Sequence, residues 1–446
     1  MRRCGILRAV SAGGTWTNFA GDQRCTPRRF ERPAGPDELR RVIADAARRG
    51  ETVRVAGAGH SFNDSVLTDG TLISLDRMAR VLDVDRDARL VRVQAGVSLG
   101  ALCDAMDAHG LAFPNMGDIN VQSIAGATAT GTHGTGLAFS NLSSCLHSIE
   151  LTLASGDVVK IGAAHDREAW LAARVSLGAL GVVSAVTIQA VPAFRLEAVD
   201  TTAPLDHTLT NLDALNERHD HFGFFTFPHS PLAMTKTWRR TDAPARPASP
   251  AATWFHDELL TNYAYWAVCR LGRARRSWIP ALNRLSAAAS GTTRYTDRSD
   301  RVYATPRRVP ITEMEYAIPR ERAAEAVRAV RAIAEQPRHD VPCPLEVRFG
   351  AADEALLAPS GGRETCWIAV HQFERMPYEP YFREVEELLA GEFDGRPHWG
   401  KRHFRDAADL APHYPGWDAF QAVRSRLDPG GTFTNAYVER VLGGVA

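Results

Sequence analysis

The feature that most constrains this chain is a short strand that runs directly into two glycines and a histidine. The stretch is Val53-Arg-Val-Ala-Gly-Ala-Gly-His-Ser-Phe62. Glycines after a strand let the backbone approach a phosphate and offer its N–H groups, because no Cβ stands in the way. The next residues, Ser61 to Asp64, are typical of a turn, not of the helix that continues a dinucleotide-binding fingerprint. The pattern predicts a nucleotide cofactor held by backbone groups and contacted by His60.

Composition and charge exclude several classes of function. The chain has 446 residues, enough for two or three domains with a large buried core. Its 52 Lys and Arg residues balance 52 Asp and Glu residues, so the basic excess of a nucleic-acid-binding protein is missing. The seven cysteines form no Cys-x-x-Cys pair, which favours free thiols in a reducing, cytoplasmic compartment over disulfides or a zinc site. We therefore expect neither a nucleic-acid partner nor a bound metal.

Two segments are candidates for contact with a membrane. The first ten residues are basic, but Arg8 interrupts their apolar run, so we expect no secretory signal there. The region from Trp254 to Leu285 is rich in aromatic residues but also contains arginines at positions 270, 273, 275 and 276. It cannot be a simple membrane span. We expect helices that pack on their own domain; an amphipathic helix in peripheral contact with a membrane surface is the alternative.

Periodic patterns in the first 195 residues predict short mixed elements. A helix is expected from Pro36 to Arg49, with Pro36 in its first turn and Gly50 after its end. A second helix should follow Ser98, whose hydroxyl can cap it. Short strands are expected at residues 72–75, 81–84, 91–95, 148–154, 158–161 and 182–190. This order indicates an α+β fold and not the regular strand–helix alternation of a Rossmann sheet.

The character of the sequence changes near residue 195, where we place a domain boundary. Strands are expected at 222–227 and 312–317, on either side of a Pro- and Ala-rich stretch at 242–252 that should be an exposed loop. A long helical region should follow that loop. A further amphipathic helix should begin at Pro319, since the apolar residues after it recur on one helical face.

A second glycine-rich segment occupies residues 117–136, Gly-Asp-Ile-Asn-Val-Gln-Ser-Ile-Ala-Gly-Ala-Thr-Ala-Thr-Gly-Thr-His-Gly-Thr-Gly. Small residues of this kind let a chain wrap closely around a flat, bulky cofactor, and Ser and Thr hydroxyls can bind phosphates. Taken alone, the segment could equally be a tightly packed corner of the core. Together with the His60 loop in one domain, it favours cofactor binding.

Several further segments, in their order and spacing, carry a family resemblance. They are Trp16-Thr-Asn-Phe-Ala-Gly-Asp22, Ala172-Ala-Arg-Val-Ser-Leu-Gly-Ala-Leu-Gly-Val-Val183, Tyr316-Ala-Ile-Pro-Arg-Glu321, Arg396-Pro-His-Trp-Gly-Lys401 and Leu427-Asp-Pro-Gly-Gly-Thr-Phe-Thr-Asn-Ala-Tyr437. Over nearly its whole length the chain resembles the vanillyl-alcohol-oxidase-type flavoenzymes. Within that group it is most similar to the aldonolactone oxidases, the sugar-lactone branch that contains gulonolactone and arabinonolactone oxidases.

The resemblance implies an α+β fold with a two-subdomain FAD-binding domain of vanillyl-alcohol-oxidase type and an α+β cap domain for the substrate. We expect the flavin domain at 12–195, the cap at 196–425 and a C-terminal segment, 426–446, that returns to the flavin domain. The resemblance also implies FAD joined covalently through His60, with no second link because residues 117–136 contain no cysteine. The residues expected around the FAD are Val55, Ala56, Gly57, Ala58, Gly59, His60, Ser61, Gly117, Ser123, Gly126, Thr130, Gly131, Thr132, His133, Val182, Val183 and His398.

The expected catalytic residues come from two further segments. Glu346 and Arg348 alternate in a stretch typical of a strand, which points both side chains to one face. On sequence alone the two could form a salt bridge and nothing more. The resemblance implies instead that Glu346 binds or deprotonates the reacting hydroxyl, that Arg348 stabilises negative charge, and that Lys401 reaches substrate oxygens. It also implies that Asp118 and His371 line the substrate pocket.

The resemblance implies oxidation of a sugar 1,4-lactone, of L-gulono or D-arabinono type, at its C2 hydroxyl. Gly117 should leave space for O2 beside the flavin, so we expect an oxidase that forms H2O2; a lactone dehydrogenase with another acceptor is an alternative. Alditol oxidases, which act on polyols, share the Glu-x-Arg and His-Trp-Gly-Lys patterns but carry a substrate-binding threonine near the position of His371. A flavin-binding protein without catalysis is disfavoured, because Glu346, Arg348 and Lys401 occur together.

Overall fold

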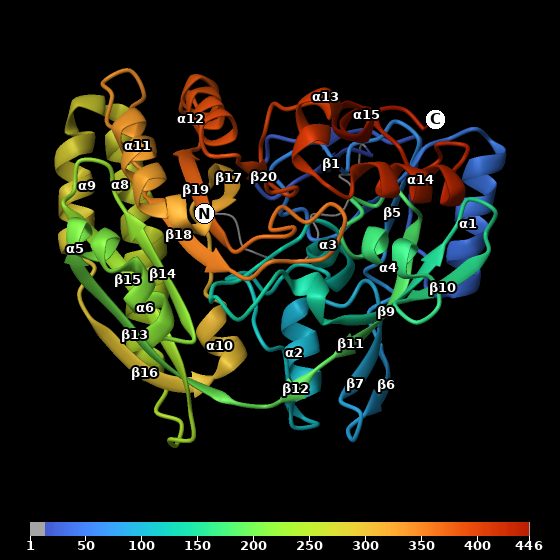
Figure 1. Ribbon diagram of the computed structural model, residues 1–446, viewed down its shortest axis with the longest axis horizontal. Coiled ribbons are helices and arrows are strands. Elements are labelled where there is room, and N and C mark those ends of the chain that lie inside the picture. The colour runs from blue at the N-terminus through green and yellow to red at the C-terminus, as the bar shows by residue number, and fades with distance from the viewer. Residues whose placement is uncertain (1–13, 446) are drawn as a thin grey trace.

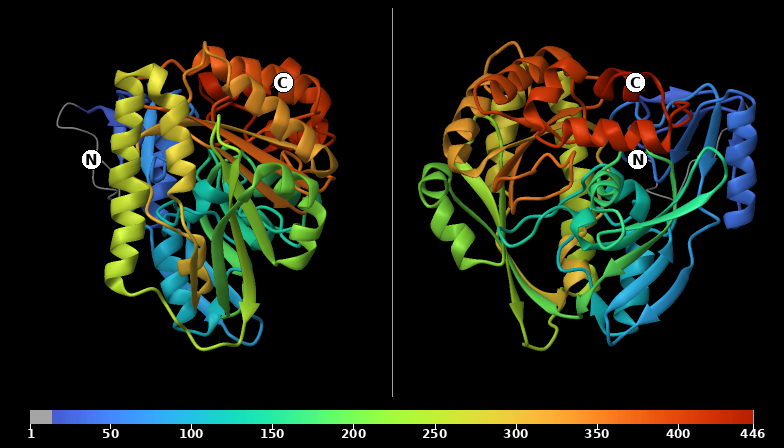
Figure 2. Two further views of the ribbon diagram at one scale, coloured as in Figure 1. Left: turned by 90° about the vertical axis from the view of Figure 1, so that its left-hand side faces the viewer. Right: turned by 45° about the vertical axis from the view of Figure 1, so that its right-hand side comes forward.

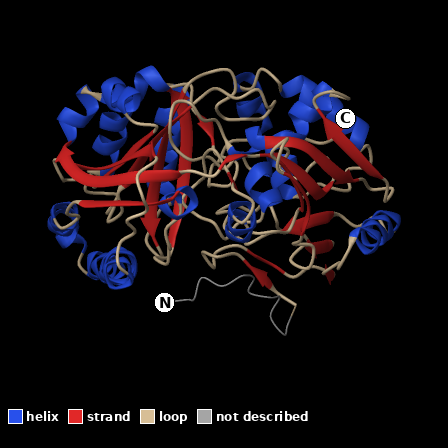
Figure 3. Cartoon of the chain, turned by 90° about the horizontal axis from the view of Figure 1, so that it is seen from below, coloured by secondary structure: helices blue, strands red, loops and turns tan. Residues whose placement is uncertain are grey.

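The protein folds into two lobes that lie side by side, seen from one face in Figure 1 and from below in Figure 3. This computed structural model describes residues 14–445. The described part leaves out the first ten residues, so the expected lack of a secretory signal there is not tested. It also leaves out residues 12, 13 and 446, which belong to the expected domains. Among the described residues, no helix combines the length and the apolar character needed to span a membrane.

The first lobe contains a small parallel sheet that ends at the first glycine loop. Its strands, in spatial order, are β3 (Arg29–Glu31), β5 (Thr71–Ser74) and β4 (Val53–Ala56). Helix α1 (Pro36–Arg48) begins at Pro36 and packs Leu39 and Ile43 against Ile73 of this sheet. Beside it, β1 (Trp16–Thr17) pairs with β2 (Arg24–Cys25). The sheet thus fixes the point from which the glycine loop departs.

A five-stranded antiparallel sheet forms the rest of the first lobe. Its strands, in spatial order, are β10 (Val158–Gly162), β9 (Leu146–Thr152), β11 (Val182–Gln189), β7 (Leu90–Gln94) and β6 (Val81–Asp85). The helices whose apolar side chains join its core are α2 (Leu99–Asp107), α3 (Ile124–Ala129) and α4 (Arg167–Arg174). The hydroxyls of Ser98 and Ser123 cap α2 and α3 by accepting hydrogen bonds from backbone amides.

The second lobe is built on an eight-stranded antiparallel sheet. Its strands, in spatial order, are β16 (Thr293–Arg298), β13 (Arg195–Pro204), β15 (Leu232–Thr241), β14 (His221–Thr226), β18 (Leu345–Gly350), β19 (Thr365–Phe373), β17 (Ile311–Pro319) and β20 (Arg396–Pro397). One face of this sheet is apolar, and four helices cover it: α5 (Leu205–Thr210), α6 (Leu212–Arg218), α11 (Ala323–Ala334) and α12 (Glu379–Gly391). The opposite face carries the charged side chains described below.

The helical region expected after residue 252 forms a hairpin on the outside of the second lobe (Figure 2). The helices α7 (Pro250–Thr253), η2 (Trp254–Ala264, a π-helix) and α8 (Tyr265–Ala274) continue into one another, and α9 (Ile279–Ala288) folds back beside them. The inner residues Cys269 and Ile279 pack with Phe373 in a small separate core. The prediction that this region packs on its own domain is therefore confirmed.

The C-terminal part of the chain returns to the first lobe, as Figure 1 shows. Helices α13 (Ala407–Leu410), α14 (Trp417–Leu427) and α15 (Ala436–Leu442) lie over it, and Phe420 and Val438 share a core with Ala172 of α4. The amide of Val53 also donates to the carbonyl oxygen of Thr432 at 2.8 Å. These contacts begin before residue 426, and the exact domain boundaries stay a prediction.

Most elements expected from the sequence are present. The remaining short elements are β8 (Leu111–Ala112), η1 (Leu142–Cys145), β12 (Val191–Pro192), η3 (Arg276–Trp278), α10 (Ser299–Tyr303), η4 (Arg320–Arg322) and η5 (Ala411–His413). One helix start was wrong: Pro319 ends β17, and a 3-10 turn follows it, so that α11 begins at Ala323. The π-helix of the hairpin was not predicted.

Candidate active site

The first glycine loop lies directly against the second glycine segment. A Cβ at Gly57 would lie 2.7 Å from the Oγ of Ser123, and Gly59 has a φ of +70° and faces the Trp16 side chain. A side chain at Gly59 would strain the backbone, and a side chain at Gly57 would displace the Ser123 hydroxyl that caps α3. No described residue accepts a hydrogen bond from the consecutive amides of residues 58–61. The loop thus offers N–H donors of the kind that bind phosphate groups.

His60 is held in a defined orientation within this loop. Its ring stacks on Phe19 with the centroids 4.6 Å apart, and its Nδ1 lies 3.1 Å from the carbonyl oxygen of Ala58. Burial lowers the pKa of His60, and the charge of Lys401 lowers it further. The ring is therefore neutral, with Nδ1–H donating to Ala58 and a lone pair left on Nε2.

The second glycine segment joins the first loop to the other lobe. A Cβ at Gly117 would lie 3.2 Å from the carbonyl oxygen of His133. The His133 ring stacks on Trp367 of β19, with the centroids 3.7 Å apart. Gly131 has a φ of +70°, and the hydroxyl of Thr130 donates to the carbonyl oxygen of Gly126 at 3.1 Å. Close backbone approach and hydroxyl groups therefore occur together, which fits a large phosphate-bearing cofactor.

Four other residues expected near the FAD belong to the strands that frame the two segments. Val55 and Ala56 end β4 immediately before the first loop. Val182 and Val183 begin β11 and pack against the core beneath α1. In the second segment, the hydroxyl of Thr132 accepts from Gln122 at 3.4 Å. These positions fix the backbone on either side of the predicted flavin-binding loops.

The polar face of the eight-stranded sheet collects charged side chains from three neighbouring strands. β17 contributes Glu313 and Glu315, β18 contributes Glu346 and Arg348, and β19 contributes His371. They alternate along each strand with residues of the apolar core, which places them on the opposite face. The expected strand at Glu346, and the shared face of Glu346 and Arg348, are confirmed.

Glu346 and Arg348 belong to a chain of alternating charges that continues to Asp118 and Arg307. Arg348 donates from Nε to Oε1 of Glu346 at 2.8 Å, and its guanidinium also lies 3.1 Å from Oδ2 of Asp118. Arg307 donates to the same Oδ2 at 2.9 Å. Burial opposes the charge of Asp118, but Arg348 and Arg307 outweigh it and hold the pKa of that carboxyl far below its ordinary value. Asp118 is therefore ionised at neutral pH.

Lys401, Glu313 and His371 form a second charged group. The Nζ of Lys401 lies 2.5 Å from Oε1 of Glu313, and Nε2 of His371 lies 3.5 Å from the same oxygen. Burial lowers the pKa of His371, but Glu313 outweighs it and raises that pKa to about 9. Burial likewise opposes ionisation of Glu313, while Lys401 and His371 lower its pKa to about 2. His371 is therefore protonated at neutral pH and has no lone pair with which to accept a proton.

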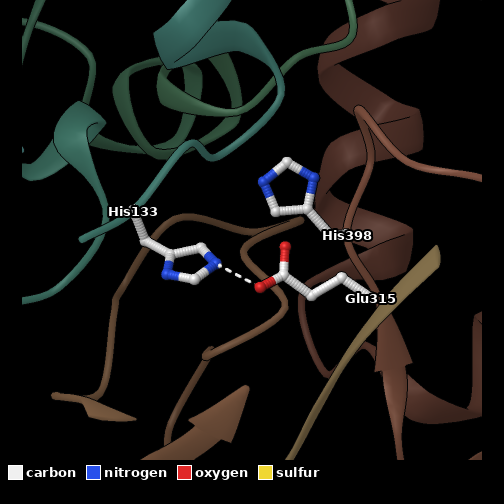
Figure 4. Close-up of side chains that lie close together, drawn as sticks. All are labelled: His133, Glu315 and His398. Atoms are coloured by element: carbon white, nitrogen blue, oxygen red, sulfur yellow. Dashed lines mark ion pairs between the residues drawn. The ribbon is translucent and has the colours of Figure 1, made fainter. Parts of the chain in front are cut away.

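A third group, His133, Glu315 and His398, joins the two lobes (Figure 4). Nε2 of His133 lies 3.3 Å from Oε1 of Glu315, and the rings of His133 and His398 have their centroids 5.6 Å apart. Nδ1 of His398 accepts from the amide of Gly400 at 3.0 Å, and burial lowers the pKa of His398 to about 3. His398 is therefore a neutral group that fixes the loop ahead of Lys401.

That loop also touches the first glycine loop. The amide of Phe62 donates to the carbonyl oxygen of Gly400 at 2.9 Å, and the Asn63 side chain donates to that of Trp399 at 2.6 Å. The Nζ of Lys401 lies 5.4 Å from the centroid of the Phe62 ring. Residues from opposite ends of the chain are thus brought together, and the predicted flavin residues lie beside the predicted catalytic residues.

Three charged residues of this site were not predicted. Glu313 and Glu315 alternate on a strand that was expected, so the argument used for Glu346 and Arg348 could have found them. Arg307 lies in the irregular stretch 304–310 and carries no sequence signal. Its role becomes visible only from its contact with Asp118.

The clusters also contain groups that could in principle hold a metal ion. The ligand atoms of Glu313, Glu346 and His371 lie within 4.8 Å of one another, as do those of His133, Glu315 and His398. In the first of these, Lys401 and Arg348 already neutralise the carboxylates. We therefore assign no metal to it, and the expectation of a metal-free protein stays a prediction.

Comparison with known proteins identifies the family. A family model described as D-arabinono-1,4-lactone oxidase matches residues 186–441. The chain belongs to this family. A second model, described as FAD binding domain, matches residues 27–162, and the enzyme is an FAD-dependent oxidoreductase. The family and the α+β fold expected from the sequence are thus confirmed.

Relatives that match over nearly the whole chain carry different names. The chain is 46% identical to L-gulono-1,4-lactone dehydrogenase of Mycobacterium tuberculosis (strain H37Rv), a match that covers 96% of this chain and 99% of the relative. It is 32% identical to L-gulonolactone oxidase of Bos taurus, with coverage of 96% and 98%. It is 35% identical to alditol oxidase of Streptomyces sp., with coverage of 96% and 99%.

The fold is shared with more distant proteins of known structure. A solvent-stable cholesterol oxidase superposes with a TM-score of 0.81 at 19% identity, over 96% of this chain and 97% of the other. Cholesterol oxidase from B. sterolicum superposes with a TM-score of 0.80 at 16% identity, over 96% of each chain. At this level of identity the likeness concerns the fold alone.

Proposed function

We propose that the protein oxidises the C2 hydroxyl of a sugar 1,4-lactone of L-gulono or D-arabinono type. The proposal rests on one observation: Glu346, Arg348 and Lys401 lie close together beside the two glycine segments. A carboxylate beside two cations at the edge of a flavin site can remove a proton while stabilising the negative charge that develops. Bound FAD supplies the acceptor of the hydride.

The charge balance of the site supports an uncharged, polyhydroxylated substrate. Four carboxylates face four cationic side chains: Asp118, Glu313, Glu315 and Glu346 against Arg307, Arg348, Lys401 and the protonated His371. An ionised sugar acid or a sugar phosphate would add an unpaired charge to this balanced group, which is costly in a buried site. A lactone brings only hydroxyl and carbonyl groups, which the same side chains can bind.

Each residue of the site has a distinct part in this scheme. Glu346 accepts the proton of the reacting hydroxyl, the role that the family resemblance implies for it; its neighbours His371, Lys401 and Arg348 are cations with no lone pair to accept one. Arg348 stays on Glu346 and stabilises negative charge on the substrate oxygen. Lys401, held by Glu313, binds the substrate oxygens. Asp118 and His371 bind further hydroxyls and orient the sugar ring.

We propose that the FAD is covalently joined to the enzyme through His60. The neutral ring, with its lone pair on Nε2, is in the protonation state that bond formation requires. Acid precipitation of the protein tests this directly: the yellow flavin should stay in the pellet, and a His60→Ala variant should release it to the supernatant. Release from the unmodified protein would overturn the link while leaving non-covalent FAD binding intact.

The proposed electron acceptor is O2, with H2O2 as product. This proposal depends on Gly117, which the family resemblance places beside the flavin and whose missing side chain keeps that position small; a Cβ there would lie 3.2 Å from the carbonyl oxygen of His133. The test is to reduce the flavin anaerobically with lactone and then admit air. Rapid reoxidation with stoichiometric H2O2 supports an oxidase; reoxidation only by an artificial acceptor would make the enzyme a lactone dehydrogenase, like the relative with that name.

A second candidate function is oxidation of open-chain polyols, favoured by the relative named alditol oxidase. Turnover should be compared on gulono- and arabinono-1,4-lactone and on xylitol and sorbitol. A clear preference for a lactone supports our proposal, and a large preference for xylitol would overturn it. If no sugar changes the flavin absorbance, the protein binds flavin without catalysis.

We propose a cytoplasmic location and, for the outer surface of the hairpin whose inner residues pack on its own domain, peripheral contact with anionic membranes. Most of the exposed large hydrophobic side chains among the described residues lie here: Trp254, Phe255, Leu260, Tyr263, Leu271, Trp278 and Leu285. Residues 254–290 also contain five arginines but only two acidic residues, in a chain of zero net charge. Exposed aromatic side chains together with an excess of basic residues suit the interface of a negatively charged bilayer.

Vesicle sedimentation tests this contact. The protein should pellet with phosphatidylcholine vesicles that contain about one third phosphatidylglycerol, and a Trp278→Ser, Leu285→Ser variant should stay in the supernatant. The matched control, Leu82→Ser with Val158→Ser, alters exposed apolar residues of the first lobe and should still pellet. A wild-type protein that stays in solution, or that covers the hairpin by forming dimers, would contradict the proposal.

A further inference from the structure

We propose that Arg307 is a positioning residue of the active site and that Asn262, in the π-helix of the outer hairpin, holds the loop that presents it. The inference rests on the proposed function, because it concerns how Asp118 and Arg348 meet the substrate. Residues 118, 262, 307 and 348 come from four separate segments of the chain, two of them loops, so only the folded structure connects them.

The first step is the attachment of the loop 304–310 to the hairpin. Asn262 is 1% exposed, and its side-chain nitrogen donates to the carbonyl oxygen of Pro306 at 2.9 Å. Its side-chain oxygen accepts from the amide of Arg308 at 2.7 Å. One buried amide thus binds the loop on both sides of Arg307. The Arg308 guanidinium adds a two-pronged ion pair with Glu258, at 2.6 and 2.8 Å.

The Asn262 side chain is also bound to its own π-helix. The same side-chain nitrogen of Asn262 donates to the carbonyl oxygen of Asp257, five residues earlier, at 2.6 Å. A π-helix closes its hydrogen bonds over five residues, whereas an α-helix closes them over four. Because π-helical segments are rare and concentrate at functional sites, its presence directly behind this loop supports a functional purpose.

The second step is the grip of the loop on Asp118. The amide of Thr305 donates to the carbonyl oxygen of Asp118 at 3.2 Å. The Arg307 guanidinium donates to Oδ2 of the same residue at 2.9 Å and from Nε at 3.3 Å. Arg307 also lies over the Phe225 ring, 5.9 Å from its centroid. The loop therefore fixes both the backbone and the carboxylate of Asp118.

The third step concerns Arg348, which shares that carboxylate. Oδ2 of Asp118 lies 3.1 Å from Arg348, while Nε of Arg348 donates to Glu346 at 2.8 Å. With Arg307 in place, two cations share the Asp118 charge, and Arg348 stays directed at Glu346. Without Arg307, Asp118 is left with Arg348 as its direct partner and draws it away from Glu346. Arg307 thus holds the geometry of the Glu346–Arg348 pair without contacting the reacting atoms.

The experiment compares Arg307→Met, Arg307→Lys and Asn262→Ala with Arg301→Met. Arg301 is an exposed arginine on α10, paired with Asp297 at 3.9 Å, and serves as the control. Two quantities are measured for each variant: the Kd of a 2-deoxy-1,4-lactone, which lacks the reacting hydroxyl, from the perturbation of the flavin spectrum, and kcat and KM for the substrate. Thermal unfolding is followed in parallel.

We expect Arg307→Met to weaken lactone binding and to lower kcat, each about tenfold, as for the loss of one charge-assisted hydrogen bond. Arg307→Lys should recover part of both losses, because it restores the charge but not the two-pronged geometry. Asn262→Ala should weaken lactone binding and lower kcat by only about threefold each, since Glu258 still holds the loop through Arg308. Arg301→Met should match the wild type.

The outcomes separate this inference from the proposed function. If Arg307→Met behaves as the wild type, or loses only thermal stability while Kd and kcat hold, the positioning role is overturned and the proposed function stands. If the wild-type enzyme oxidises neither lactones nor polyols, the proposed function is overturned, and the role of Arg307 with it.

Discussion

The two faces of the eight-stranded sheet use the same strands for opposite purposes. On β17, β18 and β19, the residues of one face are apolar and pack under helices, as Val347 and Ile368 do. The residues that alternate with them, among them Glu313, Glu346 and His371, are charged and face the flavin lobe. Because side chains alternate between the two faces of a strand, the same strands supply core residues on one face and charged site residues on the other.

The difference shows which face carries stability. Burying apolar side chains stabilises the fold, whereas burying charges costs desolvation energy that paired charges at best repay. Stabilisation of the fold therefore does not explain why this sheet carries a buried, charge-balanced face. We expect shape-conserving changes on the charged face to lower activity more than stability, and changes on the apolar face to lower stability more than activity.

The largest effect should come from Glu346→Gln, which removes the proposed proton acceptor but keeps the shape of the side chain. The rate of flavin reduction by lactone should fall about a thousandfold, as measured by rapid mixing without oxygen. Glu325→Gln, at an exposed ion pair on α11, is the control and should leave the rate unchanged. A Glu346→Gln variant that keeps more than a tenth of the rate would remove Glu346 from the mechanism.

The apolar face gives the converse result. Ile368→Ala should lower the free energy of unfolding by about 3 kcal/mol, because it opens a cavity in a fully buried core. Denaturant unfolding measures this change, and kcat and KM of the folded enzyme should stay within about twofold of the wild type. A variant that loses activity before it loses stability would show that the two faces are not separate.

Lys401→Met should have a smaller effect on activity than Glu346→Gln. It removes a cation that binds substrate oxygens, so kcat/KM should fall about a hundredfold. Steady-state kinetics checks this. Because Glu313 then keeps only His371 as its partner, the variant should also be less stable at high pH than at neutral pH. A fall in stability alone would assign Lys401 a structural role.

The pH dependence of stability should be the mildest of these effects. Burial lowers the folded-state pKa of His371, but the nearby Glu313 carboxylate outweighs burial and raises this pKa from its ordinary value of 6.5 to about 9. The stabilisation is therefore fully present below pH 6.5 and is lost as the pH rises toward 9. Thermal unfolding temperatures should fall across this window, and less so in His371→Gln. Parallel curves for the two proteins would contradict the assigned charge.

How far the sequence reaches is clear from particular residues. Gly57, Gly59 and His60 were identified from the sequence because a loop whose backbone approaches a ligand closely or adopts positive φ selects glycine, and this preference is visible locally. Glu346 and Arg348 followed from strand periodicity combined with a family resemblance. The roles of these residues are proposals, but their meeting beside the flavin lobe agrees with the expectation.

The rest could not be predicted because it depends on partners distant in the chain. Arg307 lies in an irregular loop, and its significance comes from Asp118, which is 189 residues away. Asn262 lies in a π-helix, which hydrophobic periodicity does not distinguish from an α-helix. The shifted pKa of His371 arises from Glu313 on the neighbouring strand, and the pairing of those strands is a tertiary property.

The central claim is that the charged sheet face and the flavin lobe together oxidise a sugar lactone. The most direct measurement is the flavin absorbance after purified wild-type enzyme and Glu346→Gln are each mixed, without oxygen, with L-gulono-1,4-lactone or D-arabinono-1,4-lactone. We predict rapid bleaching in the wild type and almost none in the variant. No bleaching of the wild type by either lactone, or equal bleaching of both proteins, would contradict the claim.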